Sequence, residues 1–314
     1  TVASPYAKVD VTRQADVVEE ILRIYGYNNI PFPDSMKMNL TNFPKPCPHH
    51  IKNVFSEFLV GNGFFEIMTN PLSAEKYYTE EYGFEKNKNA NILNPLSSEL
   101  NVMRRSLIFS GLESVVYNIN RKQNNLRFFE FGKIYSKLNE NKEADVIERY
   151  YEEKKLSLFM TGKVAPLNWK YKEEDVSFHH LNHPLDLLFK KAGYKDKQIE
   201  IEEFANPKYS VAVRYSDKKS KKVLAEMGEL SAEVLQLFDC KQAVYFAEIS
   251  WEVIFEQISN NNVKAKEPSK FPEVQRDIAM LIDSGIKYKD IKEVVESQGK
   301  EKIVDLRLFD IYEG

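Results

Sequence analysis

Residues 126–135 read LRFFEFGKIY, and residues 155–162 read KLSLFMTG. Both stretches are rich in aromatic and aliphatic residues and alternate in part between apolar and polar positions, which is typical of β-strands. Further runs of the same kind follow along the chain, at residues 199–204, 209–215, 221–228 and 243–255. This part of the chain is therefore predicted to be built mainly of strands.

Helices are predicted at only two places among these strands, around residues 181–191 and 232–238. Because strands follow one another and helices do not alternate with each of them, neighbouring strands are expected to pair in an antiparallel way. The predicted fold class is α+β, with a mainly antiparallel sheet that carries its helices on one side.

Two helices are predicted upstream of these strands. From His49 the apolar residues recur at helical spacing, and Gly61 and Gly63 end the segment. The run FFEIMT, residues 64–69, then follows as a strand, and a second helix is expected between residues 106 and 120. Together with the strands, these segments define a large central unit, residues 49–258.

The residues before the central unit predict a short helical unit and a linker. Asp16 precedes the run VVEEILRIYGY, whose apolar residues recur at helical spacing, and Asp16 with Glu19 fits a capping box. We assign residues 1–32 to the end of a small domain. Prolines and short polar residues oppose regular structure in residues 33–48, which we interpret as a linker.

The residues after the central unit predict a second linker, residues 259–268, and a last unit, residues 269–314. In the last unit, residues 276–283 read as a strand, residues 289–298 as a helix and residues 303–312 as another strand. A β-α-β unit is half of a ferredoxin-like fold. We therefore expect a truncated ferredoxin-like piece.

Composition restricts the class of protein. Hydrophobic residues make up 43% and charged residues 29% of the 314 residues, the balance of a globular protein with two or three units. The net charge of -3 gives no global attraction to a phosphate backbone, so RNA contacts must come from a local patch or a partner. The only cysteines, Cys47 and Cys240, stand far apart and without spaced histidines, which argues against a disulfide framework or a zinc site.

No stretch approaches the roughly 20 apolar residues that cross a bilayer, and the first residues lack the apolar core of a signal peptide. We expect a cytoplasmic protein with no membrane partner. The chain starts with Thr1 and not with Met, so we expect this end to be a boundary inside a longer chain.

An acidic group near the start of the chain is the strongest candidate metal site. Asp16, Glu19 and Glu20 occupy neighbouring helical turns, and Asp10 lies just upstream. Clustered carboxylate oxygens suit a hard divalent cation such as Mg²⁺. The spacing by itself favours the alternative, a capped helix with acidic residues in its first turn.

Histidines form a second cluster, in SFHHLNHPLD. His179 and His183 are one helical turn apart and could share a metal ion, with His180 beside them. No cysteine accompanies them, and Asp186 is the only nearby acid. We therefore favour a partly exposed helix start over a metal site.

Four stretches of the chain together resemble a known family. Residues 10–31, 61–73 and 94–135 are similar, in order, to the end of the small domain and the core of bacterial phenylalanyl-tRNA synthetase beta subunits. Residues 270–283, with LFDIYEG at the end, resemble the first half of that family's ferredoxin-fold anticodon-binding domain. Between residues 150 and 270 the similarity is weaker and depends on position.

The resemblance implies a heterotetramer of two alpha and two beta subunits that attaches phenylalanine to tRNA(Phe) with ATP. It implies that the alpha subunit holds the catalytic site and uses the ATP, while the beta core has a class II synthetase-like fold without catalysis. It also implies that Asp10, Asp16, Glu19 and Glu20 bind a Mg²⁺ ion shared with the alpha subunit. We accordingly expect no catalytic or nucleotide-binding residue in this chain.

Two motifs of class II synthetases test that expectation. Arg127 and Glu130 stand three apart on a predicted strand, as in the motif that holds the ATP α-phosphate, but an exposed ion pair explains them as well. The second motif is a glycine-rich strand-to-helix turn that ends in Glu-Arg. The corresponding segment, MGELSAEVLQLF, offers Gly228 and Glu229 but neither a Gly-x-Gly run nor an arginine.

Anticodon recognition would depend on the last unit, where Lys270, Phe271 and Arg276 are plausible contributors. With only half of that domain, we expect weak tRNA binding. Two alternatives remain open. One is a self-sufficient class II synthetase; the other is a non-enzymatic paralogue that acts as a binding or assembly module.

Overall fold

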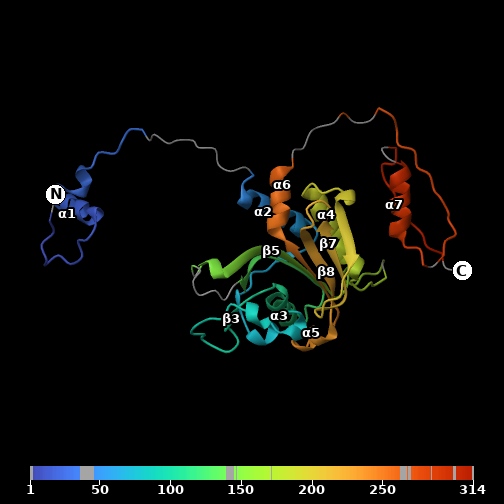
Figure 1. The fold of residues 1–314 in the computed structure, drawn as a ribbon, viewed down its shortest axis with the longest axis horizontal. Helices are drawn as coiled ribbons and strands as arrows, with labels where there is room; N and C mark the ends of the chain where they lie inside the picture. The colour runs from blue at the N-terminus through green and yellow to red at the C-terminus, as the bar shows by residue number, and fades with distance from the viewer. Residues whose placement is uncertain are drawn as a thin grey trace. The chain divides into compact units, whose positions relative to one another are not determined.

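The computed structural model describes residues 3–35, 46–138, 145, 147–170, 172–261, 267, 270–283, 285–299 and 302–312. The chain divides into two compact units, Thr1–Asn262 and Val263–Gly314, each of which is described by itself (Figure 1). The predicted linkers 33–48 and 259–268 lie largely outside the described residues. The domain limits given above therefore stay predictions.

The first unit is built on a sheet of seven strands. In spatial order the strands are β1 (Phe65–Glu66), β4 (Leu126–Lys137), β5 (Tyr150–Thr161), β9 (Val244–Ser250), β8 (Val223–Leu230), β7 (Tyr209–Asp217) and β6 (Ile199–Glu203). Only β1 and β4 pair in parallel; the other neighbours are antiparallel. The predicted α+β class and mainly antiparallel sheet are confirmed.

Helices cover both faces of this sheet (Figure 1). One face, here the α2 face, packs against α2 (Pro48–Gly61), α4 (Phe178–Lys191) and α6 (Trp251–Asn260). The opposite α3 face packs against α3 (Ile108–Ile119) and α5 (Ala232–Gln236). The prediction of helices on one side was wrong, because strand order in the sequence does not reveal which face each helix covers.

Strand β4 shows how the two faces are divided. Phe129 belongs to the core on the α2 face, whereas its neighbour Phe128 belongs to the core on the α3 face. Both side chains are buried, so the strand is apolar on both faces and does not show the alternation of a half-exposed strand. Burial of both faces explains why residues 128–131 read FFEF and do not alternate strictly between apolar and polar residues.

The run 243–255 was predicted as one strand, but only its first half is. Strand β9 ends at Ser250, and α6 begins at Trp251. Trp251 and Ile254 lie one turn apart and are buried on the α2 face, where Trp251 contacts Phe55 at 5.2 Å between ring centroids. A short apolar run fits either period, and the tertiary packing selects the helix.

Irregular segments complete the α3 face. They contain the small sheet of β2 (Leu72–Ser73) and β3 (Val102–Met103) and short 3-10 helices η2 (Glu75–Tyr77), η3 (Glu80–Tyr82) and η4 (Lys86–Lys88). Phe109 of α3 stands at the centre of an aromatic cluster with Tyr77, Tyr78 and Phe84, all within 6 Å between centroids. Further 3-10 turns are η1 (Tyr27–Asn29), η5 (Ile147–Arg149) and η6 (Asp196–Gln198).

Helix α1 (Gln14–Tyr25) forms where the sequence predicts a helix, but it begins three residues earlier than expected. Its N-cap is Arg13, and the Asp16 carboxylate accepts the Arg13 backbone N–H from position N3. Asp16 is thus not the N-cap itself. No residue of α1 is buried, and Ile21 and Ile24 of its apolar side are exposed.

The second unit contains α7 (Tyr288–Gly299), as predicted. The two flanking strands are absent: residues 270–283 and 302–312 have no ladder partner in the described part of this unit. In a split β-α-β arrangement the two strands are not neighbours, so each needs another strand between them to satisfy its backbone groups. The described residues supply none. No helix in the described part of the chain is both long and apolar enough to span a membrane.

Candidate functional site

A row of polar side chains crosses the α3 face of the sheet, one from each strand from β4 to β6. Cross-strand register aligns these residues as Glu130, Ser157, Glu248, Glu226, Arg214 and Glu202. Polar groups that converge on the face of a sheet are the usual foundation of a binding site. Their ability to bind a ligand depends on whether they already have hydrogen-bond or ion-pair partners within the chain.

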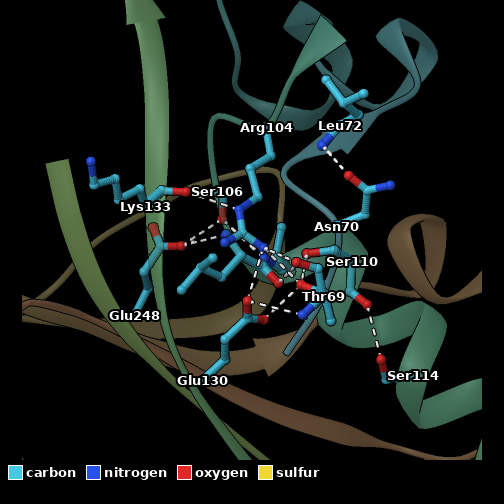
Figure 2. A network of polar contacts seen from close by, with 12 residues as sticks. Thr69, Asn70, Leu72, Arg104, Ser106, Ser110, Ser114, Glu130, Lys133 and Glu248 are labelled. Atoms are coloured by element: carbon cyan, nitrogen blue, oxygen red, sulfur yellow. Dashed lines mark hydrogen bonds and ion pairs between the residues drawn. The ribbon is translucent and has the colours of Figure 1, made fainter. Parts of the chain in front are cut away.

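At the β4 end of the row, Glu130 is fully engaged within the chain (Figure 2). Arg104 Nη1 donates to Glu130 Oε1 at 3.0 Å, and the two side chains are only 5% and 2% exposed. Thr69 adds two bonds, from its N–H to Oε1 at 3.2 Å and from its hydroxyl to Oε2 at 2.7 Å. Arg104 Nε also donates to the carbonyl of Lys133 at 2.8 Å.

In the middle of the row, Glu248 caps α3. Its Oε1 accepts hydrogen bonds from the Ser106 hydroxyl and the Leu107 N–H, both at 2.8 Å (Figure 2). A carboxylate at a helix N-terminus satisfies free N–H groups and interacts favourably with the helix dipole. Glu248 thereby ties β9 to the start of α3, which lies about a hundred and forty residues earlier.

Toward the other end, Glu226 is held by two cations. Arg214 donates to Glu226 Oε1 through Nη2 at 2.9 Å and through Nε at 3.1 Å. The Lys208 ammonium, whose side chain is 9% exposed, lies 4.0 Å from Glu226 Oε2. Every charged group of the row up to Arg214 thus has a partner in the chain itself. The row acts as an internal brace, because these charged groups are bonded to other groups of the chain.

The two residues of the suspected α-phosphate motif do not act together. Arg127 and Glu130 are three apart on β4, so their side chains lie on opposite faces of the sheet. Arg127 faces the α2 side and donates to the carbonyls of Asn62 and Val164, at 3.2 and 2.5 Å. The alternative of an exposed ion pair was also wrong, because Glu130 is buried and pairs with Arg104.

The glycine-rich turn is missing at both strand-to-helix junctions of the sheet's centre. Strand β8 leads to α5 through Ser231, and Gly228 in β8 has a packing role: a Cβ there would lie 2.3 Å from the Val211 carbonyl oxygen. Strand β9 leads directly to α6, and residues 244–260 contain neither glycine nor arginine. Neither junction contains the glycine run or the arginine of that motif.

The predicted metal ligands lie on α1 and just before it. Three of them form ion pairs with basic side chains of the same chain. Asp16 Oδ1 lies 3.1 Å from Arg13, Glu19 lies 2.8 Å from Arg23, and Glu20 lies 3.4 Å from Lys8. Backbone hydrogen bonds from Arg13, with help from its guanidinium and from Thr12, lower the pKa of Asp16. Across the residues described, no three acidic, histidine or cysteine side chains come close enough to hold a metal.

The donor chemistry nevertheless fits Mg²⁺, which prefers carboxylate oxygens. The pairs that Glu19 and Glu20 make are largely exposed, and exposed ion pairs are weak. A cation could therefore replace Lys8 and Arg23. Asp10 forms no ion pair with any described residue. The assignment of these four ligands stays a prediction.

The histidine cluster forms the start of α4, as favoured above. Ser177 is the N-cap, and its N–H donates to His180 Nδ1 at 3.0 Å. His179 and His183 are exposed. In the described part of the chain they do not join a third metal-ligating side chain.

Sequence reasoning missed Arg104, Thr69 and Glu248. One signal was present: Glu130 stands among the phenylalanines at positions 128, 129 and 131 of a strand that is buried there on both faces. An acid at such a position is almost never buried without a partner. The partner could not be named because Arg104 comes from a separate, irregular segment.

Comparison with known proteins places the chain in a family. A family model described as the phenylalanyl tRNA synthetase beta chain CLM domain matches residues 33–251. The chain belongs to the phenylalanyl-tRNA synthetase beta chain family. A second model, the ferredoxin-fold anticodon binding domain, matches residues 269–314. The resemblance seen in the sequence is confirmed.

The sequence is similar to those of individual beta chains over the full length of this chain. It is 37% identical over 317 residues to the phenylalanine–tRNA ligase beta subunit of Bacteroides fragilis, a match that covers 100% of this chain and 38% of that protein. The Bacteroides thetaiotaomicron beta subunit is 35% identical over 316 residues, with the same coverage. The chain thus spans 38% of the length of these beta chains.

More distant similarity exists to the phenylalanine–tRNA ligase beta subunit of Clostridium tetani, 29% identical over 99% of this chain and 37% of that protein. A solved pyrrolysyl tRNA synthetase from Desulfitobacterium hafniense matches with a TM-score of 0.48 and 15% identity, over 66% of this chain and 67% of that one. We infer nothing from that structural match. Membership of the beta chain family rests on the sequence comparisons.

Proposed function

We propose that this chain supplies the central and C-terminal region of the beta subunit of a cytoplasmic phenylalanine–tRNA ligase. In that role it is a scaffold and tRNA-binding partner for a catalytic alpha subunit, in an assembly of two alpha and two beta subunits. The observation that carries the non-catalytic role is the internally paired polar row. Glu130 and Glu226 are held by Arg104, Arg214 and Lys208, and Glu248 by the N-terminus of α3, so no cation of the row remains for ATP phosphates.

The experiment is phenylalanine-dependent exchange of pyrophosphate into ATP, measured for this chain alone and after copurification with an alpha subunit. We expect no exchange above background by the chain alone. Copurification and exchange by the complex would support the proposal. Exchange by the chain alone would indicate a self-sufficient synthetase, and failure to bind an alpha subunit would indicate a paralogue with another role.

The match of residues 269–314 to the anticodon-binding domain supports the proposal that the chain contacts tRNA(Phe). The described part of this domain has one helix and no paired strand, so it offers little ordered surface. We expect the isolated chain to bind tRNA(Phe) more weakly than about 1 μM at physiological salt. A filter-binding constant below that value would contradict this part of the proposal.

We further propose that Asp10, Asp16, Glu19 and Glu20 hold a Mg²⁺ ion shared with the alpha subunit. When bound, the ion would neutralise these carboxylates and link the two subunits. Calorimetric titration of Mg²⁺ into the alpha–beta complex tests this, with the double variant D16A/E20A expected to lose the binding isotherm. The double variant E80A/E81A removes two exposed glutamates outside the cluster and serves as control. Unchanged Mg²⁺ binding in D16A/E20A would discard the assignment.

A further inference from the structure

A cavity of about 310 Å³ opens on the α2 face of the sheet, away from the polar row. It lies between the end of α2, strands β4 and β5 and the first turns of α4, and Arg127 forms part of its wall. The proposed function gives this cavity no role.

Arg127 brings an unpaired positive charge to this cavity. A guanidinium group has five N–H donors, and the structure accounts for two of them, on the carbonyls of Asn62 and Val164. No carboxylate in the described part of the chain forms an ion pair with Arg127. A half-buried cation without a counter-ion is costly, and an anionic ligand would remove that cost.

Imidazoles add further hydrogen-bonding groups. His179 and His183 stand one turn apart on α4 and line the cavity. His180 also lines it, but its Nδ1 already accepts the Ser177 N–H, so its proton is on Nε2, 3.4 Å from Glu174. The acids nearest these histidines are Glu174, beside His180, and Asp186, beside His183.

Apart from Asn62, the remaining walls are apolar. Phe64, Met160 and Pro184 are buried and line the cavity together with Val164. A free phosphate ion is strongly hydrated and would meet too few polar groups here. A carboxylate on a short aliphatic chain matches both the cation and the apolar walls. The carboxylate would pair with Arg127, and the aliphatic chain would pack against the apolar walls.

We propose that this cavity receives the acidic side chain of a partner polypeptide, a glutamate-like carboxylate that pairs with Arg127 and is flanked by His179 and His183. The charge complementarity of an unpaired arginine in a mainly apolar cavity carries the proposal. It does not rest on the identity of the alpha subunit or on catalysis. It can therefore fail or hold independently of the proposed function.

The test uses butyrate as the probe and the imidazole C–H signals of the full chain in proton NMR. The chain has five histidines. Three line the cavity, whereas His49 and His50 lie at the start of α2 and are internal controls. We expect saturable shifts of the His179 and His183 signals at about millimolar butyrate, the affinity expected of so small a ligand, with the control signals unchanged at matched chloride.

Variants of Arg127 and His183 test which side chains contact butyrate. Arg127→Gln should weaken butyrate binding about tenfold or more, and His183→Gln about two- to tenfold. Because Arg127 also holds two carbonyls, Arg127→Lys provides a variant that keeps the charge should the Gln variant fail to fold, and it should retain part of the shift. His183 is exposed, so its substitution leaves the fold intact.

Three results would overturn the proposal. The first is the absence of a saturable shift, and the second is an equal shift of the His49 and His50 signals. The third is saturation by inorganic phosphate under conditions in which butyrate has no effect, which would assign a phosphate ligand instead.

Discussion

Arg104 and Glu130 form a buried ion pair of 3.0 Å between an irregular segment and the second strand of the sheet. The pair lies at one end of the polar row and is reinforced by both hydrogen-bonding groups of Thr69. Its position shows how the chain itself supplies partners for polar groups on this face of the sheet.

Replacing Arg104 with methionine should destabilise the first unit by about 3–5 kcal/mol, because it leaves the Glu130 carboxylate buried without a counter-charge. The double variant R104M/E130Q removes the buried charge as well and should recover part of the loss. Urea unfolding followed by tryptophan fluorescence measures both. A loss below about 1 kcal/mol for R104M would show that the pair is not buried as described.

Ser157 of the polar row and Ser106, which bonds to Glu248 of that row, should respond differently to alanine. The Ser157 hydroxyl is buried and has no hydrogen-bond partner among the described residues, so S157A should be neutral or stabilising, within about 0.5 kcal/mol. The Ser106 hydroxyl donates to Glu248 at 2.8 Å, so S106A should cost about 1 kcal/mol. Equal losses in thermal unfolding would contradict the network.

Gly111 lets α3 approach the sheet closely. A Cβ at this position would lie 2.2 Å from Phe159, so G111A should overpack the core and cost about 1–3 kcal/mol. Gly61, at the end of α2, has nothing within 4 Å of the corresponding position and is the matched control. G61A should be neutral or gain up to about 1 kcal/mol. Chemical denaturation of the two variants side by side gives the comparison.

Asp186 gives a pH-dependent prediction. Burial raises the pKa of its carboxyl above the ordinary 3.8, although Lys190, the Asn182 amide and His183 oppose the shift. The folded state then binds this proton more tightly than the unfolded state. The Asp186 contribution to stability is therefore fully present below 3.8 and is lost as the pH rises through the folded value.

Asp186→Asn should accordingly raise the melting temperature at neutral pH, since the amide avoids the burial of a charge and can still accept a hydrogen bond from Asn182. The advantage should shrink as the pH falls through the raised pKa of the wild-type Asp186 carboxyl. Differential scanning calorimetry over this range measures both effects. A variant that is less stable at every pH would refute the sign.

The family and the main elements of the fold followed from the sequence because they depend on local patterns. Helical spacing of apolar residues predicted α2, α3 and α4, and runs of aromatic and aliphatic residues predicted β4 to β8. Four motifs in order identified the beta chain family, which the full-length matches confirmed. Acidic residues at helical spacing marked the predicted metal ligands, which no contact in the structure tests.

The tertiary structure alone decided which polar residues are buried and which partners they meet. Glu130 looks like a surface acid until Arg104 and Thr69, from segments well before it in the chain, close over it. The same applies to α6, where packing of Trp251 selects a helix from an ambiguous apolar run. Residues 270–283 and 302–312 have strand-like sequences but no paired strand within the described part of their unit, because a strand needs hydrogen-bond partners that its own sequence cannot specify. Local periodicity fixes the elements, whereas burial and pairing depend on contacts between distant residues.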